Sequence, residues 1–225
     1  MSYNSRPYLV QLNIDRKSYK RDDRNVLLRN FTLRLKDGES VAVLGESGVG
    51  KSTLLNILGL IDRKFHGHYI FSGQDTKTIS STEAARIRNR RIGFVLQEAA
   101  LIDSLPIGDN IALPFLYASG ESQSQVRTRV ELIAKRIGIY DLLNKKPLEC
   151  SGGERARAAL ARGVIMEPEL ILADEPTAAL DDQNASKVNA LLFDFNSDHK
   201  STLVTVTHNR AHASLYGRTI ELERK

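Results

Sequence analysis

Residues 45–53 read GESGVGKST, three glycines followed by a lysine and two hydroxyl side chains. A glycine inside a regular element is destabilising by roughly 0.5–1 kcal/mol relative to alanine, so three of them in one short stretch need a local reason. The preceding residues 40–44, SVAVL, are typical of a buried strand, and residues 51–61, KSTLLNILGLI, carry apolar side chains at helical spacing. The glycines therefore lie between a strand and a helix.

This context is the one required of the phosphate-binding pattern G-x-x-x-x-G-K-[ST], which Gly45, Gly50, Lys51 and Ser52 fill. Glycines let the loop turn its backbone N–H groups inward, and the N-terminus of the following helix adds a positive dipole end. We expect Lys51 to reach the β- and γ-phosphates of a nucleotide and Ser52 to ligate Mg²⁺. An ordinary glycine-rich turn would explain neither the lysine nor the hydroxyls.

Length and composition are those of an ordinary globular protein. The chain has 225 residues, 41% hydrophobic and 26% charged, which fits one large domain or two small ones. It has no apolar run long enough for a membrane span, we expect no signal peptide, and its single cysteine fits a reducing cytoplasm. The net charge of +5 fits a solvated basic surface, because the basic run at 86–91 lacks interleaved aromatics. We therefore expect no nucleic-acid partner.

The remaining pattern alternates strands and helices, which predicts an α/β fold. Helices are expected from Ser81, taken as an N-cap, to about residue 92, and from residue 122 to Gly138. The middle of the chain is richer in helix, and we place a helical subdomain at roughly 98–165. Strands are expected at 6–14, 30–40, 67–74, 169–176 and 201–208.

Residues 170–181, LILADEPTAALD, form an apolar run that ends in two carboxylates. Parallel sheets bind ligands at the carboxyl ends of their strands, so Asp174 and Glu175 are expected beside the phosphate loop. We assign Asp174 to Mg²⁺, as the Walker B aspartate, and Glu175 to the general base that polarises the attacking water. The plainer alternative is that both carboxylates only begin a loop or cap a helix. It loses weight beside the glycine-rich loop.

Residues 150–162, CSGGERARAALAR, begin with Ser151 and Glu154 at the spacing of a capping box before an alanine-rich helix. A well-capped helix is the plainer interpretation. However, Gly152 and Gly153 weaken the first turn, and a capping box does not need them. Glycines that bare the backbone at a positive helix end suit a second anion-binding surface, where the Ser151 hydroxyl can also donate to a phosphate.

With these motifs in this order, the chain resembles the nucleotide-binding subunit of an ATP-binding cassette (ABC) transporter. The resemblance implies one ABC ATPase domain over 1–225, with a RecA-like P-loop NTPase core, an antiparallel β-subdomain and the helical subdomain. It also implies that the Walker A loop, GESGVGKST, and the LSGGQ signature of a partner subunit, here CSGGE, sandwich ATP. The implied partner is a second copy of the chain or a paralogous cassette, with ATP and Mg²⁺ as ligands.

The resemblance also implies roles for single residues. Gln97, in GFVLQEAAL, is implied to touch Mg²⁺ and the attacking water, and His208 to be the switch histidine at the γ-phosphate. Tyr19 is implied to stack on adenine, with Tyr8 or a non-stacking arrangement as the alternatives. The implied catalytic set is Glu175, His208 and Gln97, and the implied Mg²⁺ set is Ser52, Gln97 and Asp174. The implied nucleotide set is Gly45, Ser47, Gly48, Gly50, Lys51, Ser52, Thr53, Tyr19, Ser151, Gly152, Gly153 and Asp181, the last from the D-loop that crosses the dimer interface.

Residues 86–116, RIRNRRIGFVLQEAALIDSLPIGDNIALPFL, are similar to the corresponding stretch of lipoprotein-releasing (LolD-type), macrolide-exporting (MacB-type) and antimicrobial-peptide-resistance cassettes. This implies an ATPase that drives an integral membrane permease of four helices, in lipoprotein release, export or mechanotransmission. The chain would then lie on the inner face of the cell membrane through that permease. A soluble assembly ATPase and a regulatory scaffold cassette remain as alternatives. The chain does not encode the identity of the cargo.

Two positions depart from the family pattern, with Cys150 where leucine is usual and Glu154 where many members have glutamine. Cys150 is expected to pack as a small apolar side chain. Because it stands just before a helix N-terminus, we hypothesise that its thiol pKa is lowered and that alkylating it blocks closure of the dimer.

Overall fold

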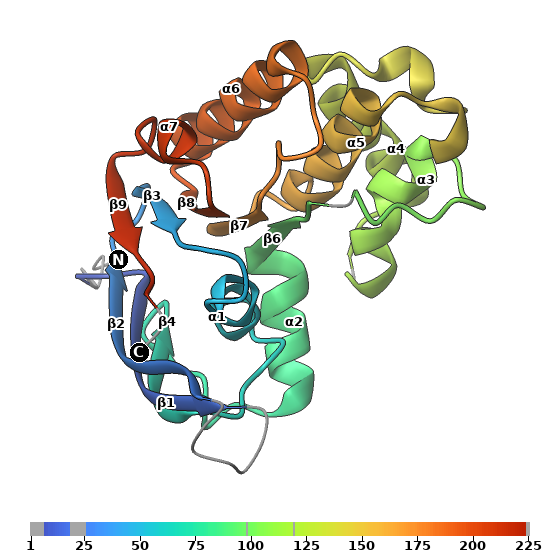
Figure 1. The fold of residues 1–225 in the computed structure, drawn as a ribbon. Coiled ribbons are helices and arrows are strands. Elements are labelled where there is room, and N and C mark those ends of the chain that lie inside the picture. Colours follow the sequence, from blue (N-terminus) through green and yellow to red (C-terminus); the bar gives the residue numbers. More distant parts are fainter. Residues whose placement is uncertain (1–6, 19–25, 98, 119, 224–225) are drawn as a thin grey trace.

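The computed structural model describes residues 7–18, 26–97, 99–118 and 120–223. They form two sheets with helices packed between and around them (Figure 1). One sheet is antiparallel, in the order β2-β1-β4-β5, and confirms the expected β-subdomain. Its strands are β1 (Val10–Ser18), β2 (Val26–Leu35), β4 (His66–Phe71) and β5 (Gln74–Asp75).

The second sheet is parallel, in the order β6-β7-β8-β3-β9, and forms the α/β core. Its strands are β6 (Ile92–Val95), β7 (Leu170–Asp174), β8 (Thr202–Thr207), β3 (Ser40–Leu44) and β9 (Arg218–Glu221). The central strands are buried, as expected for a parallel sheet covered on both faces. Because the strands are parallel, the segments that follow β3, β7 and β8 emerge at one edge. That edge carries the site.

The two faces of the parallel sheet belong to different cores, as β3 illustrates. Val41 and Val43 pack with α1 (Lys51–Leu58) and the antiparallel sheet, and α1 lies between the two sheets (Figure 1). Ala42 and Leu44 point to the opposite face, where α5 (Gly152–Val164) and α6 (Asp182–His199) cover the sheet. This packing fixes the N-terminus of α1 beside the carboxyl ends of the neighbouring strands.

The stretch expected to be helical contains α3 (Ile107–Ala112), α4 (Gln123–Arg136) and α5, and its described residues include no strand. Three 3₁₀ segments connect them, at Leu113–Tyr117, Tyr140–Leu142 and Pro147–Glu149. α5 packs against both α3 and β6, so it joins this helical part to the parallel sheet. Figure 1 shows the helical part at the upper right, with α6 leading back to the sheet.

Two helix boundaries differ from the expectation by one or two residues. α2 (Ser81–Arg91) is capped by Ser80, whose hydroxyl accepts from the Glu83 N–H, so the assignment of the cap to Ser81 was wrong. α4 ends at Arg136 rather than Gly138, which has a φ of 69°. A glycine in the left-handed region follows the last helical turn instead of belonging to it.

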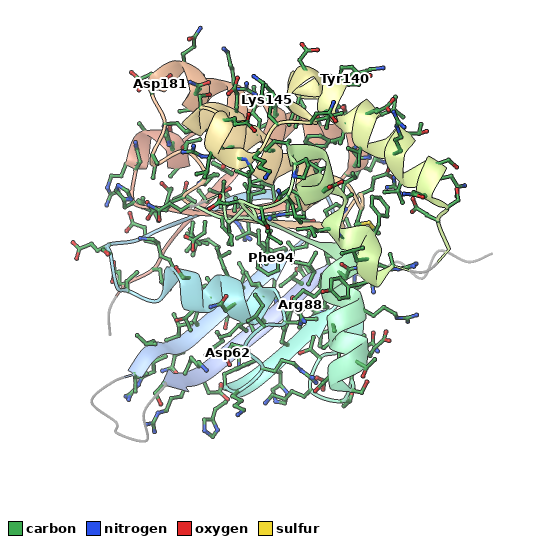
Figure 2. All side chains as sticks on the ribbon, turned by 90° about the vertical axis from the view of Figure 1, so that its right-hand side faces the viewer. Asp62, Arg88, Phe94, Tyr140, Lys145 and Asp181 are labelled. Carbon is green, nitrogen blue, oxygen red and sulfur yellow. The ribbon has the colours of Figure 1, made fainter. Side chains whose placement is uncertain are left out.

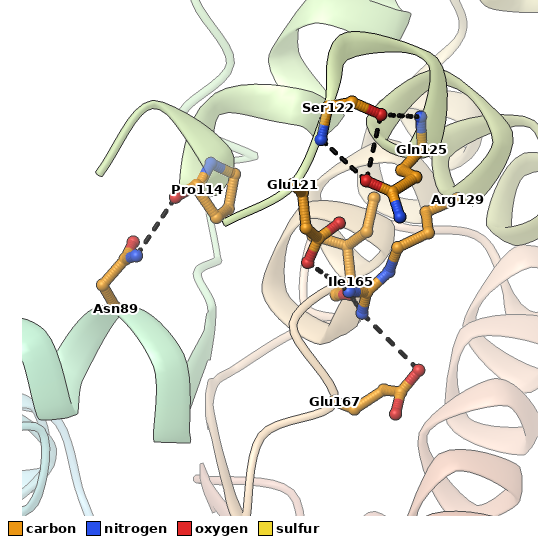
Figure 3. Close-up of polar contacts among 8 residues, drawn as sticks. All are labelled: Asn89, Pro114, Glu121, Ser122, Gln125, Arg129, Ile165 and Glu167. Carbon is orange, nitrogen blue, oxygen red and sulfur yellow. Dashed lines mark hydrogen bonds and ion pairs between the residues drawn. The ribbon is translucent and has the colours of Figure 1, made fainter. Parts of the chain in front are cut away.

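The third difference lies at the end of α1. The helix ends at Leu58 because Leu60 turns into the left-handed region, with a φ of 58°. Arg88 of α2 donates to the Leu60 carbonyl at 3.1 Å, and Phe94 of β6 packs against the same helix end (Figure 2). Ile61, expected on the apolar face of this helix, therefore lies beyond it and is 56% exposed.

Candidate functional site

The phosphate loop joins β3 to α1, and its glycines are used for two reasons. Gly48 and Gly50 have φ of 77° and 108°, a region that other residues rarely adopt. Gly45 is restricted by space, since a Cβ there would lie 2.8 Å from the Leu222 carbonyl oxygen. The N-cap of α1, like that of α3, provides no side-chain acceptor, whereas the N-caps of α2, α4, α5, α6 and α7 (Arg210–Ala213) all do. The first N–H groups of α1 are thus suited to an anion.

Lys51 is folded back onto this loop. It is 7% exposed, and its Nζ donates to the carbonyl oxygens of Gly45 at 2.7 Å and Glu46 at 3.1 Å. The same Nζ lies 3.4 Å from Glu175 Oε1. A buried ammonium is stable only where acceptors and an opposite charge replace water. The loop therefore holds a cation at the point where the sequence predicts phosphates.

Ser52 and Asp174 bring the start of α1 to the end of β7. The Ser52 hydroxyl donates to Asp174 Oδ2 at 2.9 Å. Burial raises the pKa of the Asp174 carboxyl and nearby Glu175 adds to this, while the hydrogen bond from Ser52 and the charge of Lys51 oppose it. A hydroxyl and a carboxylate in contact are hard oxygen donors of the kind that Mg²⁺ prefers. The donor set therefore fits the predicted metal.

Glu175 and His208 form the next contact along the sheet edge, from the ends of β7 and β8. His208 Nδ1 lies 2.6 Å from Glu175 Oε2, and the Glu175 side chain is 13% exposed. The Glu175 backbone has a φ of 43°, and its N–H donates to the Val206 carbonyl at 3.0 Å. A left-handed conformation at a non-glycine residue is strained and persists only where surrounding contacts hold it. Here those contacts come from Lys51, His208 and β8.

The capping box predicted at the start of α5 is present. The Ser151 hydroxyl accepts from the Glu154 N–H at 3.3 Å, and the Glu154 carboxylate accepts from the Ser151 N–H at 2.7 Å. The hydrogen bond from Ser151 lowers the pKa of Glu154. Ser151 and Gly152 are exposed, and the Ser151 side chain bonds only within this box in the described part of the chain.

The two signature glycines have different surroundings. A Cβ on Gly152 would meet nothing nearer than Leu180 Cδ2, at 3.9 Å. A Cβ on Gly153 would lie 2.5 Å from the side chain of Asn184 in α6. Gly153 is therefore small because Asn184 packs against it, a reason that the sequence did not reveal. Gly152 is the one that leaves backbone open to a ligand.

Asp181 begins α6 and is engaged within its own chain. Its carboxylate accepts from the Asn184 N–H at 2.9 Å and from Asn184 Nδ2 at 2.7 Å, and these bonds lower its pKa. Arg157 of α5 reaches Asn184 Oδ1 at 3.4 Å. Asn184 thus joins the D-loop to the signature helix. None of the sequence motifs singles out Asn184, although an amide three residues after an N-cap aspartate is a recognisable local pattern.

The remaining residues predicted for the site are Ser47, Thr53, Gln97 and Tyr19. Ser47 is exposed and lines, with His208, a cavity of about 570 Å³, and Thr53 is buried in the first turn of α1. Gln97 is exposed two residues after β6 and forms no hydrogen bond with any residue that the structure describes, Ser52 and Asp174 included. Tyr19 lies outside the described residues.

Cys150 packs as expected, buried, with its Sγ 3.5 Å from the Lys146 carbonyl oxygen. Burial raises the pKa of the Cys150 thiol, and the charge of Glu154 adds to it. The hypothesis of a lowered pKa was therefore wrong. Desolvation and the neighbouring carboxylates outweigh the charges of Lys145 and Arg155, which lower the pKa.

Known proteins that are similar to this chain belong to the family that the motifs indicate. The profile of the ABC transporter family, described as "ABC transporter", matches residues 28–178. The ABC transporter ATP-binding protein YxdL of Bacillus subtilis (strain 168) is 42% identical over 91% of this chain and 79% of its own length. The lipoprotein-releasing system ATP-binding protein LolD of Syntrophus aciditrophicus (strain SB) is 37% identical over 95% of this chain and 96% of its own. The macrolide export ATP-binding/permease protein MacB of Syntrophobacter fumaroxidans is also 37% identical, but the chain spans only 30% of that protein.

The fold is shared with solved structures as well. A dimeric structure of a post-hydrolysis state of the ATP-binding cassette MJ0796, bound to ADP and Pi, superposes with a TM-score of 0.87. It is 35% identical and covers 96% of this chain and 94% of its own. Among the described residues, none of the helices is long and apolar enough to cross a membrane. Profile, relatives and fold agree, and the chain belongs to the ABC transporter family as one of its ATP-binding, ATP-hydrolysing cassettes.

Proposed function

We propose that this cassette hydrolyses MgATP as a head-to-tail dimer of two copies and thereby drives an integral membrane permease of the LolD/MacB-like kind. The observation that carries the proposal is the gathering of Lys51, Ser52, Asp174, Glu175 and His208 at one edge of the parallel sheet. These side chains provide a cation, a metal-binding pair and a carboxylate held by an imidazole. Together they are the groups that phosphoryl transfer to water requires.

The phosphates of ATP fit the loop and the N-terminus of α1. On binding, Lys51 would exchange the carbonyl oxygens of Gly45 and Glu46 for the β- and γ-phosphates, which are stronger acceptors. Mg²⁺ would be held by Ser52 and Asp174, with Gln97 joining them from the segment after β6. When bound, the metal neutralises charge on the transferred phosphoryl group.

Glu175 is the proposed general base. Its carboxylate is almost buried and is oriented from two sides, by Lys51 Nζ and by His208 Nδ1. Once Lys51 has turned to the phosphates, the carboxylate still held by His208 can take the proton of a water that attacks the γ-phosphate. His208 would lie at the γ-phosphate and keep the base aligned. Most of the rate would come from positioning and electrostatics.

The signature belongs to the other half of the proposed dimer. Ser151 and Gly152 are exposed at the N-terminus of α5, outside the cluster at the sheet edge. Facing a second copy, they would complete the γ-phosphate site with a hydroxyl and bare backbone N–H groups. The D-loop, with Asp181 at its end, would lie at the same interface. The one-domain organisation over 1–225, with its helical subdomain, suits this arrangement.

The permease and the position on the inner face of the membrane are supported by resemblance. The LolD and MacB relatives are named for lipoprotein release and for macrolide export with a permease. In this chain Leu96, Ile102, Leu116 and Tyr117 are exposed apolar side chains after β6, in the part where the family meets its membrane subunit. Hydrolysis would reopen the dimer, and this surface would pass the motion to the permease.

The test uses Glu175→Gln, which removes the base and keeps the shape of the side chain. In MgATP the purified variant should lose ATPase activity by at least about 100-fold and elute as a dimer, whereas Lys51→Ala should stay monomeric. From detergent-solubilised membranes the tagged Glu175→Gln chain should retain a four-helix permease, identified by mass spectrometry. Recovery of a soluble partner instead would favour the assembly ATPase. Turnover at the wild-type rate would remove Glu175 from its role.

A further inference from the structure

A second contact joins the two loops that carry the Glu175–His208 pair. Thr177 follows Glu175 by two residues, and His212 follows His208 by four. Thr177 Oγ1 and His212 Nδ1 are 3.3 Å apart, a hydrogen bond that either neutral tautomer of the imidazole can make. Thr177 is only 6% exposed, so its hydroxyl depends on a protein partner.

Both ends of this bond are fixed by their own loops. On one side, the Ala178 N–H donates to the Glu175 carbonyl at 3.1 Å, which closes the turn around Thr177. On the other, α7 (Arg210–Ala213) is capped by Asn209, whose side chain accepts from the N–H of His212 at 3.2 Å. The Asn209 N–H in turn bonds the Thr207 hydroxyl at the end of β8, at 3.0 Å. A displacement of His212 is thus transmitted to the segment that carries His208.

This bond lies where two loops of the site run next to each other. β7 and β8 are adjacent, with Asp174 beside Val206, so the turn after β7 and the helix after β8 run side by side. Among the described residues, the Thr177–His212 bond is the one side-chain hydrogen bond between these two loops apart from the Glu175–His208 contact itself. Glu175 has a strained φ of 43°, a conformation that persists only where surrounding contacts maintain it.

We propose that His212 is a positioning residue, which through Thr177 fixes the turn of Glu175 against α7 and so aligns Glu175 with His208. The inference rests on the proposed role of Glu175. His212 touches neither nucleotide nor metal in this account. Its loss would leave the Thr177 hydroxyl buried without a partner, and the turn would relax toward a conformation that satisfies it.

The experiment is a double-mutant cycle of Thr177→Val and His212→Leu, read by steady-state ATPase kinetics. Each single variant should lower kcat by about 2- to 10-fold, the equivalent of one neutral hydrogen bond, and leave KM for ATP unchanged. The double variant should be no slower than either single one, because all three lack the same bond. Thr177→Val keeps the shape of the side chain, so it tests the bond even where His212→Leu perturbs folding.

Conservative variants separate positioning from packing. His212→Asn places an amide where Nδ1 stood and should restore most of kcat, whereas His212→Gln carries its amide too far and should not. Ser214→Ala, a matched change that removes another hydroxyl just after α7, should leave kcat unaltered. Additive losses in the cycle, an unchanged kcat in Thr177→Val, or equal rates for Asn and Gln would each overturn the proposal. If Glu175→Gln keeps wild-type turnover, the proposed function fails first, independently of the cycle.

Discussion

Two helices of this chain have a glycine at the N-cap or in the first turn, and they differ in how their first N–H groups are satisfied. α1 follows Gly50, has no side-chain cap, and keeps a buried lysine beside its first turn. α5 begins at Gly152 and is capped in both directions by Ser151 and Glu154. The first helix end has no side-chain acceptor for its N–H groups, which suits it to an anion. The second is capped by side chains of its own chain and is exposed, which suits a surface that one molecule presents to another.

The difference extends to the surroundings. The Walker A end is joined to both carboxylates of the Walker B strand by Lys51 and Ser52. The signature end is joined instead to the D-loop, through Asn184. One chain therefore contains two separate clusters, the Walker half around Lys51 and the signature half around Ser151. The following predictions test whether the Walker half of one copy works only with the signature half of a second copy.

Mixing two inactive variants should produce the largest effect. Lys51→Ala damages only the Walker A half, and Ser151→Arg only the signature half, and each alone should lose at least about 100-fold in ATPase activity. A heterodimer of the two contains one wholly intact site. An equal mixture should recover about a quarter of the wild-type rate, since half the dimers are mixed and half of their sites work.

The matched control mixes Lys51→Ala with Glu175→Gln. Both residues belong to the Walker half, so every site in the heterodimer carries one lesion, and no activity should return. Recovery in this control, or none in the first mixture, would contradict the assignment of the halves to different copies.

Metal dependence should give the next largest effect. Ser52→Ala removes a hydroxyl that lies 2.9 Å from Asp174, and should raise the Mg²⁺ concentration for half-maximal ATPase by about tenfold. Chelation with EDTA should stop hydrolysis by the wild type. Titration of ATPase rate against Mg²⁺ measures the shift, and ATP binding without metal serves as the control. Identical Mg²⁺ curves for the two proteins would exclude Ser52 from the metal site.

A smaller effect is expected where the signature meets the D-loop. Gly153→Ala forces a Cβ to within 2.5 Å of Asn184, and should lower ATPase activity by about three- to tenfold through the displaced side chain. In an Asn184→Ala background the same change should cost little more. Gly152→Ala is the control, because its Cβ has open space within the chain. Any activity that this variant loses reflects the contact with the nucleotide and not packing inside the chain. If Gly153→Ala is equally harmful in both backgrounds, the glycine serves ATP and not packing.

The motifs in the sequence were sufficient for the parts of the site that depend on local spacing. Strand 40–44, the turn of glycines and the start of α1 at Lys51 follow from residue order alone, as does the capping box at Ser151. Contacts between distant segments left no local pattern. The packing of Asn184 on Gly153 joins residues 31 apart, and the bond from Thr177 to His212 joins residues 35 apart, so both depend on the tertiary fold. The cap of α2 was misplaced because two adjacent serines offer the same chemistry.

Substitution of Cys150 should have the smallest effect on ATPase activity. The same residue shows how tertiary surroundings can reverse the local rule that a helix N-terminus lowers a thiol pKa. Its raised pKa depletes the thiolate at any pH below that value, so alkylation at pH 8 should be much slower than that of a free thiol of pKa about 8.5. The rate should keep rising with pH where the free thiol has levelled off, and urea-unfolded protein should react at the ordinary rate. Mass spectrometry of maleimide-treated samples measures each rate. Since the side chain packs and, within the described residues, hydrogen-bonds only the Lys146 carbonyl, Cys150→Ala should change ATPase activity by less than about twofold. If the thiol of the folded protein reacts as fast as a free thiol, Cys150 is accessible, and the hypothesis that its alkylation blocks dimer closure stands again.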